Sequence, residues 1–189
     1  MNIDIILPFR EKFTLLQASA VSTSIKNSII NSSFKKNIKI YGHAVIDPML
    51  PENFIGIKTN KLLHFSNNVS IIKNYLKLQL YKKEKKLIEI HNRPYLLKYL
   101  FSKIKNNPIV FYFHNDPTKM KGSKTISERK EILNKASGIV FVSRFLKEKF
   151  LHGINLESSK LHILPNSLSI NKNSFSKKDS KVLFVGRIV

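Results

Sequence analysis

Residues 89–94 (EIHNRP) and 109–117 (IVFYFHNDP) are the two stretches that decide the predicted fold. In each case a mainly apolar run, residues 87–90 or 109–113, leads into His-Asn, and Pro follows two residues after the Asn. Short, continuous apolar runs between turn residues are typical of strands that are covered on both faces, as in a parallel sheet. The sequence therefore predicts two buried strands, one ending just before His91 and the other just before His114.

The same pattern recurs along the chain and alternates with helical patterns. Further strands are predicted over residues 3–7, 38–41, 62–65, 139–142, 161–164 and 182–185. Thr125 and Glu128 have capping-box spacing, Ser143 is placed to cap the next helix, and Gly153 is placed to end it. Strands that alternate with helices predict an α/β fold, a Rossmann-like, doubly wound and mainly parallel sheet with helices on both faces.

Length and composition exclude several classes of protein. A chain of 189 residues that is 42% hydrophobic can bury one real core and is not a disordered chain. It contains no Cys, which excludes a disulfide scaffold and a Cys-ligated zinc site. The longest apolar run, residues 109–113, is far shorter than the ~20 residues that span a bilayer. With Asp4 inside the first apolar run and no basic flank before it, no signal peptide is predicted, and a cytoplasmic location is expected.

The net charge of +21 has three candidate explanations. The 28 Lys, 18 Asn and 24 Ile residues rise together in AT-rich genomes, whatever the protein does, and the basic residues are spread along the whole chain. A basic surface also suits an anionic acceptor or the inner face of the cytoplasmic membrane. Nucleic acid is the third candidate, but the known binding motifs are missing from the sequence, so no nucleic-acid partner is expected.

Polar side chains follow the predicted strands where ligands of parallel sheets bind. His91 with Asn92, and His114 with Asn115, offer hydrogen bonds that suit a polyhydroxyl ligand such as a sugar. The alternative is that these residues only make turns and cap strand ends. After the first strand, the loop at residues 8–13 carries cations that either contact an anionic ligand or are simply solvated.

Several kinds of catalytic site find no support in the sequence. A dinucleotide fingerprint, a P-loop, a nucleophile elbow and paired carboxylates are all missing. A zinc site built on His91 and His114 lacks a third ligand, so neither a metal nor a cofactor is expected. The lysine-rich loop at residues 117–124 is either a mobile lid over an acidic ligand or a plain flexible surface loop.

Four segments, taken in order, resemble the N-terminal half of a family 4 glycosyltransferase with the two-domain GT-B architecture. They are residues 111–117 (FYFHNDP), 136–143 (ASGIVFVS), 160–166 (KLHILPN) and 182–187 (VLFVGR). The resemblance departs from the family where glycine is expected, since residues 17–21 (QASAV) contain none and Ser167 follows Pro-Asn.

The resemblance implies retaining transfer of a sugar from a nucleotide sugar to a glycan or glycolipid acceptor, with lipopolysaccharide biosynthesis as the expected setting. It implies donor contact by His114, which would also be catalytic, and by Arg187, whose guanidinium suits a diphosphate. The acceptor contacts that we expect at the same edge are Arg10, Lys12, Ser19, His91, Asn92 and Arg93.

The resemblance also sets the expected domain organisation. Residues 1–170 would form the acceptor-side domain, residues 171–180 a linker rich in Ser, Lys and Asn, and residues 181–189 the first strand of an absent donor-binding domain. Two alternatives follow from that absence: an inactive truncated remnant, or one half of a split enzyme whose partner chain supplies the missing domain. A basic nucleic-acid-binding module is the third alternative.

Overall fold

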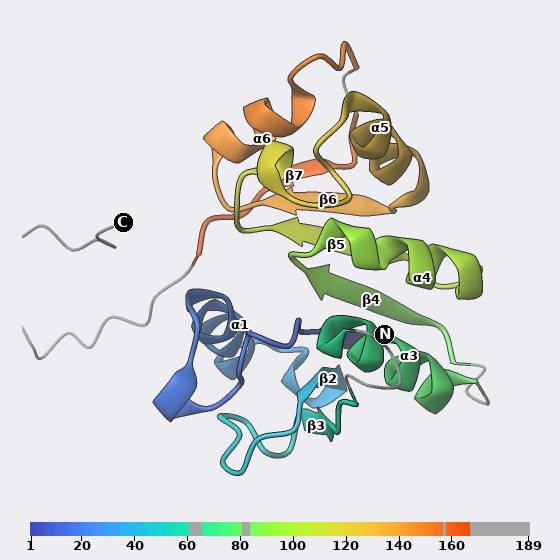
Figure 1. Ribbon diagram of the computed structural model, residues 1–189. Coiled ribbons are helices and arrows are strands. Elements are labelled where there is room, and N and C mark those ends of the chain that lie inside the picture. Colours follow the sequence, from blue (N-terminus) through green and yellow to red (C-terminus); the bar gives the residue numbers. More distant parts are fainter. Residues whose placement is uncertain (61–65, 81–83, 157, 167–189) are drawn as a thin grey trace, which may run out of the picture.

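The computed structural model describes residues 1–60, 66–80, 84–156 and 158–166, and it shows an α/β, Rossmann-like fold (Figure 1). Its sheet has seven strands in the order β3-β2-β1-β4-β5-β6-β7, and every neighbouring pair is parallel. The strands are β1 (Asn2–Ile6), β2 (Ile38–His43), β3 (Phe54–Ile57), β4 (Lys86–His91), β5 (Ile109–Phe113), β6 (Gly138–Phe141) and β7 (Leu161–Ile163).

The connections between strands are helical at most positions. The α-helices are α1 (Ala20–Ile30), α3 (Asn67–Gln79), α4 (Leu97–Lys103), α5 (Ile126–Lys135) and α6 (Arg144–Leu151). Short 3-10 turns are η1 (Leu15–Gln17), η2 (Lys35–Asn37), η3 (Pro94–Leu96) and η4 (Pro117–Lys119). The predicted fold class is therefore confirmed.

The local signals for helix ends are confirmed as well. Thr125 and Glu128 form the reciprocal capping box of α5. The Ser143 hydroxyl accepts from the Leu146 N–H at the start of α6, and Gly153 follows that helix with φ +76°. These features depend on a few neighbouring residues, so the sequence alone predicts them.

The predicted strands and the observed strands differ in two respects. β3 was not predicted, because its short sequence FIGI is interrupted by Gly56 and three of its four residues are partly or fully exposed. The predicted strands at residues 62–65 and 182–185 lie outside the described residues, as do the predicted linker and terminal strand at 171–189. The other predicted strands are shifted by at most two residues.

Two apolar layers hold helices against the sheet. In the smaller layer, Val21, Ile25 and Ile29 of α1 pack against Ile5 and Ile40 of the central strands. In the larger layer, side chains of α3, α4, α5 and α6 pack against the opposite face, where the rings of Phe113, Phe141 and Phe150 lie 5.3–5.5 Å apart. Figure 1 shows α1 on one side of the sheet and α3 and α4 on the other.

The second face of β4 and β5 is only half covered by described residues. Burial alternates along these strands, and the side chains of Leu87, Glu89, Val110 and Tyr112 are partly exposed. The sequence predicts cover on both faces, whereas the described residues cover one face of these strands fully and the other only in part. The reason is the right-handed crossover rule, which places every helix that follows β4 on the same face.

A buried ion pair joins β1 to β4 beneath α3. The Lys86 ammonium lies 3.2 Å from the Asp4 carboxylate, and both side chains are at most 5% exposed. The Tyr75 hydroxyl donates to the same carboxylate at 2.9 Å, and Lys86 also donates to Gln79 at 2.9 Å. Burial and the neighbouring Asp4 charge raise the pKa of Tyr75, so its hydroxyl remains a donor.

We expect Lys86→Met to lower the free energy of unfolding by about 3 kcal/mol, because it leaves Asp4 buried without its cation. Lys135→Met is the matched control, since Lys135 pairs with Glu131 at an exposed site and its loss should cost at most about 0.5 kcal/mol. Urea unfolding measures both values. Equal losses in the two variants would contradict a structural role for the buried pair.

Candidate functional site

The candidate site lies at the carboxyl edge of the sheet, where the strand order changes direction between β1 and β4. In doubly wound sheets the loops diverge at this point and leave a crevice in which ligands bind. Ile6 pairs with Ile90 across the two strands, which places the loop after β1 next to His91. His114 follows β5, the next strand along.

Two histidines form the centre of the site. His91 Nδ1 and His114 Nε2 are 2.9 Å apart, and the Tyr112 ring stacks on His91 with 4.4 Å between ring centroids. On its other side, His91 Nε2 lies 3.8 Å from Glu89 Oε2. The carboxylate favours a proton on His91 Nε2, so that His91 Nδ1 accepts from His114 Nε2 and the lone pair of His114 Nδ1 remains free.

Asn92 is held in a strained turn beside this pair. It is fully buried, its side-chain oxygen accepts from the His114 N–H at 3.2 Å, and its own N–H donates to the Tyr112 carbonyl at 2.9 Å. Asn92 and Arg93 have φ values of +53° and +57°, the only positive φ angles of non-glycine residues in the described chain. Such conformations cost free energy and cluster at functional sites.

Three buried nitrogen atoms at this edge lack a hydrogen-bond partner: His91 Nε2, Asn92 Nδ2 and His114 Nδ1. A buried polar group without a partner costs about 1–3 kcal/mol. The described chain has one further buried side-chain atom of this kind, Asn53 Oδ1, so three of the four gather in one cluster. A ligand that supplied partners to this cluster would recover part of that cost.

Burial decides the protonation state of the cluster. Burial and then the neighbouring His91 lower the pKa of His114 to about 3, so its imidazole is neutral near pH 7. Burial and the Glu89 charge raise the pKa of Tyr112, which is therefore a neutral phenol. A neutral imidazole acceptor beside a carboxamide donor matches a hydroxyl group, which both donates and accepts.

A groove of about 190 Å³ adjoins the histidines on the half-covered face of the sheet. Ser24 and Ser28 of α1 and Ser32, two residues after the end of that helix, line the groove together with Glu89, Tyr112 and the two histidines. Sequence reasoning missed the serines and these two strand residues, although the four-residue spacing of the serines was visible.

Asn166, in the segment after β7, also lines the groove. Its side-chain oxygen accepts from the Ser24 hydroxyl at 3.1 Å. This contact joins the segment after β7 to α1 across 142 residues of sequence. A contact of such long range has no local signal, so only the tertiary structure shows it.

The other predicted site residues within the described ranges do not belong to the histidine cluster. Lys12 lies 4.2 Å above the Phe9 ring, which in turn lies 4.5 Å from the His43 ring, a partner that the sequence did not reveal. Burial lowers the pKa of Lys12, and burial and then the Lys12 charge lower the pKa of His43. Arg10 is exposed on the same loop, Ser19 caps α1, and Arg187 lies outside the described residues.

The loop at 117–124 fits neither alternative drawn from the sequence, a lid or a flexible surface loop. Gly122 has φ +91°, and a Cβ there would lie 2.4 Å from the Tyr95 nitrogen, so the loop packs closely on the turn after β4. Ser123 is buried and donates to the Pro117 carbonyl at 2.6 Å. Arg129 donates to four carbonyls, two in this loop and two at the end of α6.

Within the described ranges, no group of three or more His, Cys, Asp or Glu side chains could hold a metal ion. In the part of the chain that the structure describes, no helix has the length and apolar character needed to cross a bilayer.

Comparisons with known proteins support the fold. No family model and no curated protein matches the chain. A solved structure of similar fold is the N-terminal domain of trehalose-6-phosphate phosphatase from Candida albicans, with a TM-score of 0.54 and 12% sequence identity. The match covers 87% of this chain and 48% of that one, so this chain spans about half of its neighbour. At this identity the likeness shows the fold alone.

The identification as a family 4 glycosyltransferase is wrong. The similar structure is a domain of a phosphatase, and no glycosyltransferase model matches. Retaining sugar transfer, lipopolysaccharide assembly, the truncated remnant and the split enzyme depend on the same identification and fall with it. The physical reason is that the three segments within the described ranges, residues 111–117, 136–143 and 160–166, consist of strands with the turns and caps at their ends, which parallel α/β sheets use for many functions.

We expect His114→Gln to flatten the dependence of stability on pH. The unfolded chain takes up a proton on this histidine below its ordinary pKa of 6.5, whereas the folded chain does so only near pH 3. Stability is therefore fully present well above pH 6.5 and is lost as the pH falls toward 3, by about 3 kcal/mol at pH 4.5. Urea unfolding at a series of pH values measures this loss.

The matched control for this measurement is His162→Gln, which changes an exposed histidine on β7. In this variant the free energy of unfolding should depend on pH as it does in the wild type between pH 7 and pH 4. An unchanged slope in His114→Gln would contradict the burial of a neutral imidazole at the site.

Proposed function

We propose that this domain binds a phosphorylated carbohydrate at the carboxyl edge of its sheet. The observation that carries the proposal is the cluster of three buried nitrogen atoms without a hydrogen bond on His91, Asn92 and His114, of which only His91 Nε2 has a carboxylate nearby, at 3.8 Å. The strained turn at Asn92 and Arg93 supports it, because the fold maintains that strain at the same place.

Sugar hydroxyls are the groups that suit the cluster best. A hydroxyl can donate to the free lone pair of His114 Nδ1 and accept from Asn92 Nδ2, which satisfies both atoms at once. Because the histidine is neutral near pH 7, this contact requires no change of charge. The serines of α1 can supply further hydroxyl contacts along the adjoining groove.

The phosphate group has candidate partners around the same crevice. Arg93 is half-buried and follows Asn92 directly, and Arg10 and Lys12 lie on the loop after β1, across the switch point. A guanidinium can pair with two phosphate oxygens. The similar structure belongs to a phosphatase whose name specifies trehalose 6-phosphate, a phosphorylated sugar, and this supports the choice of ligand class.

Binding is a better proposal than catalysis for this domain. A general base works best when its pKa lies near the operating pH, and His114, with a pKa of about 3, is a weak proton acceptor at pH 7. The catalytic role that was expected for His114 is therefore not part of the proposal.

A cytoplasmic location stays a prediction from the sequence, and contact with an anionic membrane surface stays a prediction from the charge.

We expect trehalose 6-phosphate and glucose 6-phosphate to bind in calorimetric titration, and trehalose and inorganic phosphate to bind more weakly. Asn92→Gly should lower the affinity about tenfold, because it removes the amide donor. The same variant should change the free energy of unfolding by at most about 1 kcal/mol, because glycine relieves the positive φ while the contact to His114 is lost. Loss of affinity without loss of stability separates a ligand contact from a structural one.

His114→Ala should also weaken the sugar phosphates about tenfold, whereas His162→Ala, at an exposed position, should not. Equal affinity in wild type and Asn92→Gly would overturn the proposal. Release of inorganic phosphate from either sugar phosphate during the titration would show that the domain hydrolyses the ligand, and a hydrolytic function would then replace the proposed binding function.

A further inference from the structure

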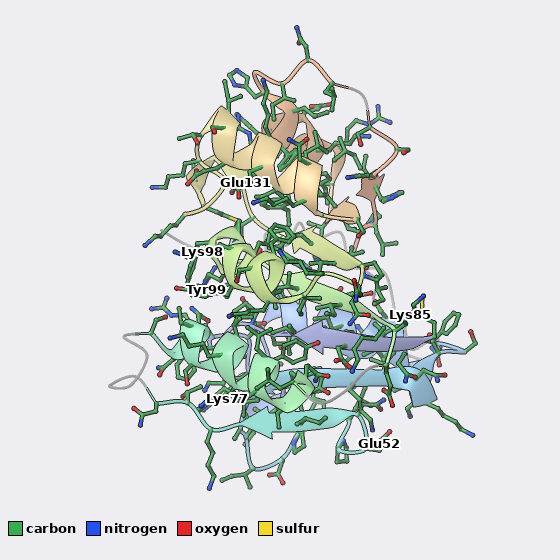
Figure 2. The ribbon with its side chains drawn as sticks, turned by 90° about the vertical axis from the view of Figure 1, so that its right-hand side faces the viewer. Glu52, Lys77, Lys85, Lys98, Tyr99 and Glu131 are labelled. Carbon is green, nitrogen blue, oxygen red and sulfur yellow. The ribbon has the colours of Figure 1, made fainter. Side chains whose placement is uncertain are left out.

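A second groove lies at the opposite, amino end of the sheet, away from the histidines. Its volume is about 870 Å³, and its walls are the carboxyl-terminal halves of α3 and α4 and the start of β4. Such a volume is in the range of ligand sites in proteins. Figure 2 views the molecule from the side of α3 and α4, with Lys77 and Lys85 labelled.

The floor of this groove is apolar. Leu76 and Leu80 of the α3 end, Ile88 of β4 and Ile104 at the end of α4 line it. Leu80 is 71% exposed, so the groove includes apolar surface that faces water. Covering such surface releases free energy of about 25 cal/mol per Å².

The rim of the groove is strongly basic. Five exposed lysines line it, and the only exposed acid among its lining residues is Glu84. The five are Lys73, Lys77, Lys85, Lys103 and Lys105. The sixth lysine of the groove, Lys86, is neutralised by Asp4.

Helix ends explain only part of this charge. Lys77 and Lys103 lie in the last turns of α3 and α4, where the helix dipole favours cations. Lys73 lies in the middle of α3, and Lys85 lies outside any helix. None of these four ammonium groups has an acidic partner within the described ranges, whose ion pairs involve other residues.

We propose that this groove binds a single-chain anionic amphiphile such as a fatty acid. The acyl chain covers Leu76, Leu80 and Ile104, and the anionic head group lies among the rim lysines. An apolar floor with a rim of uncompensated positive charge is complementary to this ligand class, which joins one long apolar chain to one negative charge. The inference is independent of sugar-phosphate binding, because the two sites lie at opposite ends of the strands.

The test is a calorimetric titration of the full chain with dodecanoate below its critical micelle concentration, with dodecyl maltoside as the uncharged comparison. We expect saturable binding of one dodecanoate per chain and weaker binding of the maltoside. Lys73→Glu combined with Lys103→Glu should weaken dodecanoate about tenfold, since two attractive charges become repulsive. Lys98→Glu is the control for charge, because Lys98 is exposed on α4 but does not line the groove.

A pair of neighbouring leucines tests the apolar floor. Leu80→Ser should weaken dodecanoate about fivefold, whereas Leu78→Ser should not, because Leu78 is 49% exposed and lies outside the groove. All these positions are exposed, so the variants should fold. Because the two sites lie at opposite ends of the strands, trehalose 6-phosphate should not compete with dodecanoate. The His114→Ala variant should bind dodecanoate with the affinity of the wild type.

Three results would overturn the proposal. They are no saturable binding of dodecanoate, equal effects of the Leu78 and Leu80 variants, and capture by anionic phospholipid vesicles without binding of monomeric dodecanoate. The last result would assign the lysines to a membrane surface instead of a site for a single molecule.

Discussion

The pairing of β1 with β4 at the centre of the sheet is the constraint on which the rest of the structure depends. The pair is held beneath α3 by the buried contact between Asp4 and Lys86, to which Tyr75 also donates. Strands are added outward in both directions from this pair, so the chain changes direction here. The register of the pair brings the loop after β1 next to His91 and so creates the crevice in which the candidate site lies.

The handedness of the crossovers then determines which surfaces are left for ligands. Because all helices after β4 pack on one face, the other face of β4 and β5 carries polar and half-exposed side chains, including Glu89 and Tyr112. On that face α1 packs on β1 and β2, and its Ser24 and Ser28 line the groove beside the histidines. The polar groove therefore follows from topology, although each strand by itself looks like part of a fully buried sheet.

The two ends of the sheet have opposite chemistry. At the carboxyl end, buried nitrogen atoms without hydrogen-bond partners can form directed hydrogen bonds, and the contacts of Asn92 with His114 and Tyr112 hold its side chain in place. At the amino end, exposed lysines surround an apolar floor and offer little directional contact. The first arrangement suits recognition of hydroxyl positions, whereas the second suits a ligand defined only by a charge and an apolar chain.

The sequence by itself determined six of the seven described strands, the helix caps and the fold class, because apolar runs and caps such as Thr125 with Glu128 depend on neighbouring residues. It also placed His91 and His114 at one edge, since the carboxyl ends of adjacent parallel strands must meet there. The family resemblance failed because its described segments are features that this fold shares across many functions. Only the tertiary structure decided that His114 is neutral, that Ser24, Ser28 and Asn166 line a groove with it, and that described residues cover one face of β4 and β5 only in part. Burial and contacts across long stretches of sequence control these properties, and neither leaves a local pattern.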